Sequence, residues 1–542
     1  WLIRFLPGRF VGSFGNPIYA GAALLMGLPV VLAGTLAATA WRGPWIGLAA
    51  GAVGAGAAGM TAAAIALTMA RGPWVGAAVA VALFLVVGWR ILPPHMRWRL
   101  VLLTVASAAV ALWLLAAIND PRGRRFNDPS DGPTSISAAV ERAAAAPAAV
   151  RDGLNGRERI WMGSLRVAAS RPWFAFEDGS PVLLRHLLGY GPDSFPYVYP
   201  LGEEPSLSET VRLTRDAHNQ YINMLVEQGV LGLLVSLGMT AVPLVAGGYV
   251  LLRRSAAYPW RTRLLLLGVL SALAGRAAEQ LVGVDKLADT MLSWALLGLL
   301  VALPVPVPVP ARAAPAAPSG SAAPGNRLRL AVAPAAAMIL VLLATVTIAQ
   351  AINPLIAARD AVLSQRARGR SDGFVALERI TAAIGRAPAV EGYRLNAVAL
   401  LDEVRGLDVL PPEQRASLLL SALAVLKEGL DHTPLSPQLN LQLGLHYQGL
   451  AEYNIGEGGP LALEAFERTA ALLPNHWQPK RNLGVVLLAA GRPADALPLL
   501  SEVVDILGDA EPVDDVRLLL DAALREAGRL AERAERAAPA PG

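Results

Sequence analysis

Apolar runs long enough to cross a lipid bilayer constrain this chain more than any other feature of its sequence. A membrane-spanning helix needs about 20 consecutive apolar residues. The runs cover residues 18–40, 45–70, 74–92, 100–118, 222–252, 264–283, 288–305 and 328–351. Hydrophobic residues make up 54% of the chain, which is too apolar for an average soluble protein. The sequence therefore predicts a membrane protein with several spans, of which 288–305 is marginal in length.

Changes in composition divide the rest of the chain. The predicted segments are transmembrane helices in 1–118, a large loop in 119–221, further transmembrane helices in 222–303, a Pro/Ala-rich linker in 304–327, one more span in 328–351 and a helical repeat domain in 352–542. The expected fold is all-α: a polytopic transmembrane helix bundle with a large extracytoplasmic loop, followed by an α-solenoid. Because the chain opens at Trp1 inside what resembles an ongoing motif, we expect further helices before it.

Short basic turns orient the predicted bundle. The turns at 89–99 and 253–263 carry three and four arginines, respectively, and no acidic residue. Lys and Arg concentrate in short cytoplasmic loops, so both turns should be cytoplasmic and the 119–221 loop between them extracytoplasmic. Counting on through span 328–351 places the repeat domain outside as well. We attribute the net charge of +5 to this topology rather than to nucleic-acid binding.

The tail from 352 onward contains a recurring pattern of small and apolar residues followed by proline. Three sets share the offsets 0, 4, 7 and 12: Ala376, Ile380, Ala383 and Pro388; Ala422, Leu426, Gly429 and Pro434; Ala462, Phe466, Thr469 and Pro474. This register is typical of tetratricopeptide repeats, whose helix hairpins cross at small residues and end at proline. A generic Ala/Leu-rich bundle is the alternative. Because such solenoids present a concave protein-binding surface, we expect a protein partner or acceptor there.

The predicted topology brings basic residues and a histidine to the same outer face. Arg71 lies at the end of one span, Arg157 and Arg159 lie in the large loop, and His218 lies where the loop meets another span. Guanidinium groups bind phosphate oxygens bidentately, and a neutral histidine can accept a proton from a hydroxyl. The combination suggests glycosyl transfer from a lipid-linked diphosphate. The alternative for each arginine alone is snorkelling toward lipid headgroups. The alternative for His218 is an interfacial histidine that caps or hydrogen-bonds the start of a helix.

The residues beside His218 extend this hypothesis. Arg215 and Asn219 are candidate substrate-binding residues, and Asp216 is close enough to orient the imidazole. The chain has no cysteine, which excludes disulfides, thiolate metal ligands and a cysteine nucleophile. The loop lacks a His-x-x-x-His or Asp-rich pattern, so we expect no metal and no cofactor.

Several of these stretches together resemble the O-antigen ligase / O-antigen polymerase superfamily of bacterial membrane glycosyltransferases. They are Gly12-Ser-Phe-Gly-Asn-Pro-Ile-Tyr-Ala; Leu67-Thr-Met-Ala-Arg-Gly-Pro-Trp; Gly156-Arg-Glu-Arg-Ile-Trp with Arg171-Pro-Trp and Gly189-Tyr-Gly-Pro-Asp-Ser-Phe; and Ala217-His-Asn-Gln-Tyr with Glu227-Gln-Gly-Val-Leu-Gly. Their order, with the long loop between them, is more specific than any one stretch. Two features depart from the family pattern: Ala70 stands where serine is usual, and residues 175–188 are an insertion.

The resemblance implies an inverting, metal-independent transfer of a glycan from an undecaprenyl-diphosphate carrier, at the outer face of the bacterial cytoplasmic membrane. His218 matches the acceptor-activating histidine of the family, and Arg71 and Arg157 match arginines that hold the diphosphate. Arg159 is a second candidate for the loop arginine. The activity could be that of a ligase, a polymerase or a protein oligosaccharyltransferase. A membrane scaffold acting through its repeats, and less favourably a transporter, remain the alternatives.

Overall fold

The computed structural model describes most of the chain. The described residues are 5–6, 9–10, 16–40, 44–118, 146–174, 176–177, 182–205, 213–254, 257–303, 338, 342, 345, 352–406, 410–453 and 455–537. The predicted linker 304–327, and all but three residues of the predicted span 328–351, lie outside this set. The chain forms two compact units: a membrane-helix unit, and a repeat unit that also includes loop residues 172–179 and 197–213. The domain boundaries proposed from the sequence stay predictions.

In the part of the chain that the structure describes, seven helices form the membrane-helix bundle. They are α1 (Pro17–Ala38), α2 (Pro44–Leu67), α3 (Arg71–Ile91), α4 (Pro94–Ile118), α9 (Gln220–Arg253), α10 (Trp260–Gln280) and α11 (Leu287–Ala302). Among the described residues, α1 to α4 and α9 are long and apolar enough to cross a membrane. Helix α10 carries Arg276 and Glu279 in its second half, and the apolar part of α11, 289–302, is short. The predicted all-α multi-pass fold is confirmed. Before α1, two antiparallel strands of two residues each form a small hairpin (β1, Phe5–Leu6; β2, Arg9–Phe10).

Helices α1 and α10 occupy the centre of this bundle. Helix α1 is apolar on all sides, which is typical of a helix surrounded by other helices, and it packs against α2, α3 and α10. It begins at Asn16, whose side chain accepts a hydrogen bond from the backbone N–H of Ile18 (2.8 Å), and Pro17 takes the first helical position. The Asn-Pro pair of the N-terminal motif therefore sets the start of the central span.

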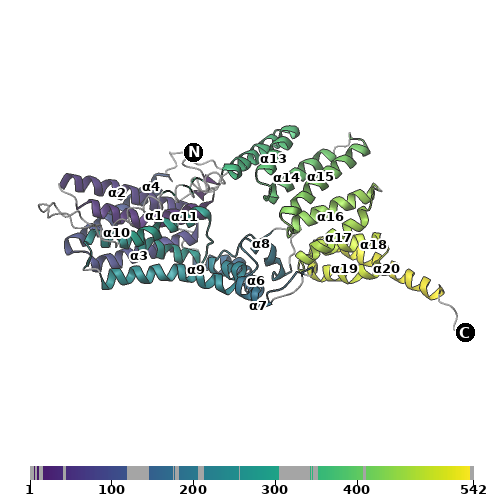
Figure 1. Cartoon of the computed structure of the whole chain (residues 1–542), viewed down its shortest axis with the longest axis horizontal. Helices are drawn as coiled ribbons and strands as arrows, with labels where there is room; N and C mark the ends of the chain where they lie inside the picture. Colours follow the sequence, from purple (N-terminus) through teal and green to yellow (C-terminus); the bar gives the residue numbers. More distant parts are fainter. Residues whose placement is uncertain are drawn as a thin grey trace, which may run out of the picture. The chain divides into compact units, whose positions relative to one another are not determined.

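Helices α3 and α10 lie side by side (Figure 1). They approach each other most closely at two facing glycines, Gly76 and Gly275. A Cβ atom added at Gly76 would lie 2.6 Å from the carbonyl oxygen of Gly275, and one added at Gly275 would lie 2.6 Å from that of Gly76. Small residues allow such close backbone approach between membrane helices. The crossing matters for the site, since Arg71 precedes it on α3 and Arg276 follows it directly on α10.

Replacing Gly76 with alanine should destabilise the bundle by about 1–3 kcal/mol, because the added methyl group overpacks a contact between two backbones. Gly56→Ala on α2 is the matched control: no atom lies within 4 Å of its new Cβ among the described residues. Its higher helix propensity should leave stability unchanged or raised by up to about 1 kcal/mol. Thermal unfolding in detergent measures both, and equal shifts for the two variants would contradict the close crossing.

The basic turns meet at one end of the bundle. Arg99 donates to the carbonyl oxygen of Thr39 (2.7 Å), and Arg261 donates to that of Ala40 (3.0 Å). The turns after α1, before α4 and before α10 are therefore neighbours. Since α2 and α9 run from one end to the other, Arg71 and the start of α9 lie at the opposite end. This arrangement fits the topology that the arginine-rich turns predict.

The repeat unit is a series of antiparallel helix pairs (Figure 1). Its helices are α13 (Gly373–Arg386), α14 (Glu391–Arg405), α15 (Pro412–His432), α16 (Pro437–Glu452), α17 (Gly458–Leu472), α18 (Trp477–Ala489), α19 (Pro493–Leu507) and α20 (Val513–Ala537). Each packs against its neighbours in sequence, as in a solenoid. The predicted register is confirmed: the three positions before each proline are buried, and Gly444 lies against the ring of Phe466.

Candidate functional site

His218 is held in a tight turn directly before α9. Its backbone has a positive φ of 49°, and its N–H donates to Oδ1 of Asp216 (3.0 Å). The same carboxylate oxygen lies 3.2 Å from Nδ1 of the imidazole. Trp161 of helix α6 (Ala146–Ser170) donates its indole N–H to the carbonyl oxygen of Ala217 (2.9 Å), which fixes the turn from the loop side. The imidazole itself is 44% exposed, so Nε2 is free to meet a substrate.

Asn219 connects the turn to the first residues of α9 and to the end of α10. Its side-chain oxygen accepts from the N–H groups of Tyr221 (3.0 Å) and Ile222 (3.1 Å), which caps α9. Its amide group donates to the carbonyl oxygen of Leu281 at the end of α10 (2.9 Å). Lys286 approaches the second oxygen of Asp216 (3.4 Å). Asn219, predicted to bind substrate, is thus engaged in positioning His218 against α10.

Arg71 begins α3 after a turn that the Leu-Thr-Met-Ala-Arg-Gly-Pro-Trp segment builds. The hydroxyl of Thr68 (2.7 Å) and the indole N–H of Trp74 (2.9 Å) both donate to the carbonyl oxygen of Ile65 near the end of α2. Thr68 also accepts from the N–H of Ala70 (3.3 Å). These bonds set the angle between α2 and α3, and they place Arg71 at a helix N-terminus, where a negative charge is favoured.

Arg157 on α6 lies within electrostatic reach of Arg71. Burial lowers the pKa of Arg157, and the positive charge of Arg71 lowers it further, while Glu279 and Asp216 act in the opposite direction. An arginine stays protonated in proteins. Burial is thus the main cause of the lowered pKa, and the contribution of Arg71 shows that the two guanidinium groups lie close enough to repel each other. An anion between them would relieve this repulsion.

The remaining arginines predicted from the sequence lie apart from this pair. Arg159 follows Arg157 by two residues, about 200° around α6, and its side chain is exposed. Arg215 is also exposed, three residues before His218. The structure thus brings Arg71, Arg157 and the Asp216–His218 pair together. The functional roles of all these residues remain predictions.

Helix α9 is interrupted at Gly229, and loop residues satisfy the exposed carbonyl groups. Gly229 has φ 66° and ψ −163°, which is not helical. The guanidinium of Arg171, 2% exposed, donates to the carbonyl oxygens of Leu225 (2.5 Å) and Val226 (2.8 Å). The N–H of Gly191 donates to the carbonyl oxygen of Glu227 (2.7 Å). In a membrane, such carbonyl groups need protein partners, because lipid provides none.

Two glycines allow the loop to pack closely against the interruption in α9. A Cβ atom at Gly189 (φ 74°) would lie 2.3 Å from the carbonyl oxygen of Glu227, and one at Gly229 would lie 2.4 Å from that of Leu187. Leu187 belongs to helix α7 (Val182–Leu188), which lies within the 175–188 insertion. The Glu227 side chain accepts from the N–H of Phe195 (3.2 Å) at the start of helix α8 (Phe195–Val198). The loop motif that begins at Gly189 and the motif that begins at Glu227 thus pack directly against each other. We call this contact the joint between the loop and α9.

A buried charged cluster next to the site did not emerge from the sequence reasoning. Arg276, 3% exposed, donates to Glu279 and Asp285, and its guanidinium lies 3.5 Å from Asp289. The sequence signal was available, since ionisable residues inside an apolar run usually mark function. Glu279 also connects the cluster to the surface that carries Arg71 and Arg157, which we call the arginine face. A Cβ atom on Gly72, next to Arg71, would lie 3.4 Å from the Glu279 carboxylate.

Comparisons with known proteins agree with the resemblance seen in the sequence. Residues 55–237 match the family described as O-antigen ligase, and this segment contains Arg71, Arg157 and His218. This segment is similar to an O-antigen ligase domain, and the chain around it is a multi-pass membrane protein. No curated protein matches the chain.

Solved structures match through the repeat unit. One is MamA protein, 15% identical, with 34% of this chain and 98% of that chain covered and a TM-score of 0.24. Another is a thermophilic TPR protein of Thermus thermophilus, 23% identical, with 37% of this chain and 99% of that chain covered and a TM-score of 0.25.

Proposed function

We propose that this protein transfers a glycan from an undecaprenyl-diphosphate carrier to an acceptor hydroxyl, as a ligase, a polymerase or a protein oligosaccharyltransferase. The observation that carries the proposal is the pair Arg71 and Arg157, whose positive charges lie within electrostatic reach of each other, beside a histidine that Asp216 orients. The O-antigen ligase match over 55–237 supports a membrane glycan ligase or polymerase.

Arg71 and Arg157 would hold the diphosphate of the donor. Both guanidinium groups remain charged through the reaction, and each can bind phosphate oxygens in a bidentate manner. As the bond between the anomeric carbon and the diphosphate oxygen breaks, the leaving group keeps the electron pair. The two arginines would then stabilise the additional negative charge without any metal.

His218 would act as the general base. With Nδ1–H directed to Asp216, Nε2 carries a lone pair and can take the proton of the acceptor hydroxyl. The acceptor oxygen then bonds to the anomeric carbon from the face opposite the diphosphate, which inverts the configuration. Asp216 would stabilise the imidazolium until it releases its proton to water.

The topology follows from the same arrangement. By the positive-inside rule, the end with Arg99 and Arg261 would lie in the cytoplasm, so the site would face outward from the bacterial inner membrane. Loop segments pack within the repeat unit: Asn475 donates to the carbonyl oxygen of Glu203 (2.8 Å), and Arg468 lies over the ring of Phe176 (4.1 Å). This packing supports a repeat domain on the same outer side, where it would recruit a protein partner or acceptor.

Replacing Arg157 with methionine tests the donor site. Loss of one charge-assisted contact to the diphosphate should lower transfer by at least about tenfold at limiting donor, since such bonds contribute roughly 1.5–3 kcal/mol. Arg159→Met is the matched comparison on the same helix, because its side chain is exposed, and it should change transfer far less. Transfer is measured in membranes supplied with lipid-linked glycan. Full activity of Arg157→Met would overturn the proposed donor site and favour the scaffold alternative.

A further inference from the structure

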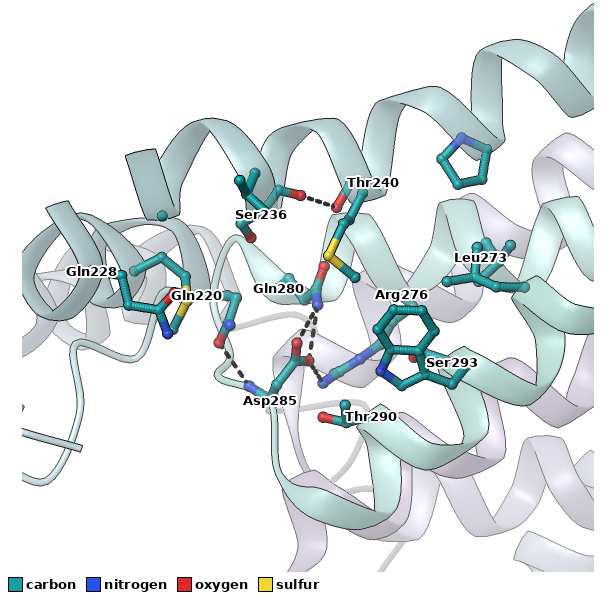
Figure 2. A pocket seen from close by; sticks show the side chains of 17 residues that line it. Gln220, Gln228, Ser236, Thr240, Leu273, Arg276, Gln280, Asp285, Thr290 and Ser293 are labelled. Atoms are coloured by element: carbon teal, nitrogen blue, oxygen red, sulfur yellow. Dashed lines mark hydrogen bonds and ion pairs between the residues drawn. The ribbon is translucent and has the colours of Figure 1, made fainter. Parts of the chain in front are cut away.

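A cavity of about 310 Å³ opens between α9, α10 and α11, with Arg276 and Asp285 in its wall (Figure 2). The volume is at the lower end of ligand pockets, which are typically about 300–1000 Å³, so it suits a small head group rather than a whole glycan. We refer to it as the α9–α11 groove. Arg276 lines the groove, and its partner Glu279 lies against Gly72, next to Arg71. No step of the proposed transfer yet uses the groove.

The charges of the α9–α11 groove differ from those of the arginine face. Arg276, the one guanidinium among the described residues of its wall, is already engaged by the carboxylates of Glu279, Asp285 and Asp289. Three carboxyl groups sharing one guanidinium leave no positive charge to hold a phosphate. An anionic head group would be repelled here, and it would lose its hydration without a partner in return.

Hydrogen-bonding groups nevertheless surround the polar part of the groove. Figure 2 shows Gln220, Gln280 and Thr290 around Asp285. Gln280 donates to both oxygens of Asp285 (2.8 and 2.9 Å), and the N–H of Asp285 donates to Gln220 (3.0 Å). Nε of Arg276 has no hydrogen-bond partner among the described residues, although the side chain is only 3% exposed. Gln220, Gln280 and Thr290 are the uncharged hydrogen-bonding groups that line this part of the groove.

The far part of the groove is apolar. Met239, Pro243, Leu297 and Val235 line it, and Leu234 is an exposed hydrophobic side chain on the adjoining surface of α9. A ligand that fills both parts needs a polar head without charge and a hydrocarbon chain. The polar part also starts close to the proposed base, because Gln220 follows His218 by two residues on the same turn of chain.

We infer that the α9–α11 groove binds the uncharged, hydroxyl-bearing head of a membrane amphiphile and brings that hydroxyl toward His218. The acceptor role rests on the proposed function, whereas the binding does not. The shared chemistry fits two sources: an amphiphile that receives the glycan, or a bilayer lipid that remains unmodified. In either case the groove separates a neutral ligand from the diphosphate, which the arginine face attracts.

Photo-crosslinking of the full-length protein in phosphatidylcholine vesicles tests the binding. The probe is a diazirine-bearing alkyl glucoside. We expect labelled peptides from α9 and α11, and competition by unlabelled octyl glucoside at least about tenfold better than by octyl phosphate, a factor of about 1.4 kcal/mol. Equal competition by the phosphate would overturn the inference.

Matched variants locate the site. Ser236→Trp fills the groove and should lower labelling about tenfold. Leu234 is 58% exposed on α9 and does not line the groove, so Leu234→Trp should leave labelling unchanged. Thr290→Val removes a hydroxyl without adding bulk, and it provides the test if Ser236→Trp does not fold. Unchanged labelling in both groove variants would contradict the inference.

A transfer assay on the same samples separates the two sources. Glycan added to the glucoside identifies an acceptor, and labelling without transfer identifies a bound lipid. Because the labelling needs no donor, it can succeed even if the proposed glycan transfer fails.

Discussion

Replacing His218 with alanine should abolish glycan transfer while leaving donor binding unchanged. General-base catalysis contributes about 10²–10⁴-fold, and no other described side chain takes the position of the imidazole between Asp216 and the start of α9. The measurement is the initial rate of glycan transfer in membranes at matched expression, together with retention of the lipid-linked donor.

Two further variants make this prediction specific. Asp216→Asn keeps the shape of the side chain but weakens its support of the imidazolium, so its loss should be smaller than that of His218→Ala. His432→Ala removes an exposed histidine at the end of α15 in the repeat unit and should leave transfer intact. If His218→Ala retained full transfer, the acceptor would have to be activated in another way.

Replacing Arg171 with methionine should have the largest effect on folding. Its guanidinium satisfies the carbonyl oxygens of Leu225 and Val226 where α9 is interrupted, and it is 2% exposed. Each buried polar group left without a partner costs about 1–3 kcal/mol, so the variant should lose roughly 2–5 kcal/mol of stability. Thermal unfolding in detergent, or the yield of folded protein in membranes, reports the loss.

Arg171→Lys and Arg159→Met serve as comparisons for the loss of the Arg171 hydrogen bonds to α9. Lysine keeps the charge but cannot bond two carbonyl groups with a planar fork, so we expect a partial loss. Arg159 is exposed on α6, and removing it should change stability by less than about 0.5 kcal/mol. Wild-type stability in Arg171→Met would show that the joint between the loop and α9 is not what holds the interruption.

The sequence predicted the parts of the fold that depend on local pattern. Apolar length located the spans, and small residues at fixed offsets before proline located the repeats, because both patterns follow directly from helix geometry. The polar cluster before α9 and Arg71 before α3 were found for a similar reason. Each is a charged or polar group next to a span. The free-energy cost of placing such a group near the membrane interior makes it stand out in the sequence.

The parts that were missed depend on contacts between distant segments. Nothing local to Arg171 indicates that it caps carbonyl groups 54 and 55 residues away. Gly229 lay inside the predicted span 222–252, although its positive φ interrupts α9. Arg276 was read as part of a plain span because its partners Asp285 and Asp289 come from the following turn and helix. Tertiary pairing, rather than composition, makes that cluster stable.

The most direct test of glycan transfer is reconstitution of the purified full-length protein in vesicles that contain an undecaprenyl-diphosphate-linked glycan and a hydroxyl-bearing acceptor. We predict that the acceptor gains the glycan and that undecaprenyl diphosphate is released in equal amount, without added metal. If folded protein binds the donor but neither product forms with any acceptor, glycan transfer is contradicted and a scaffold acting through the repeats becomes the better explanation.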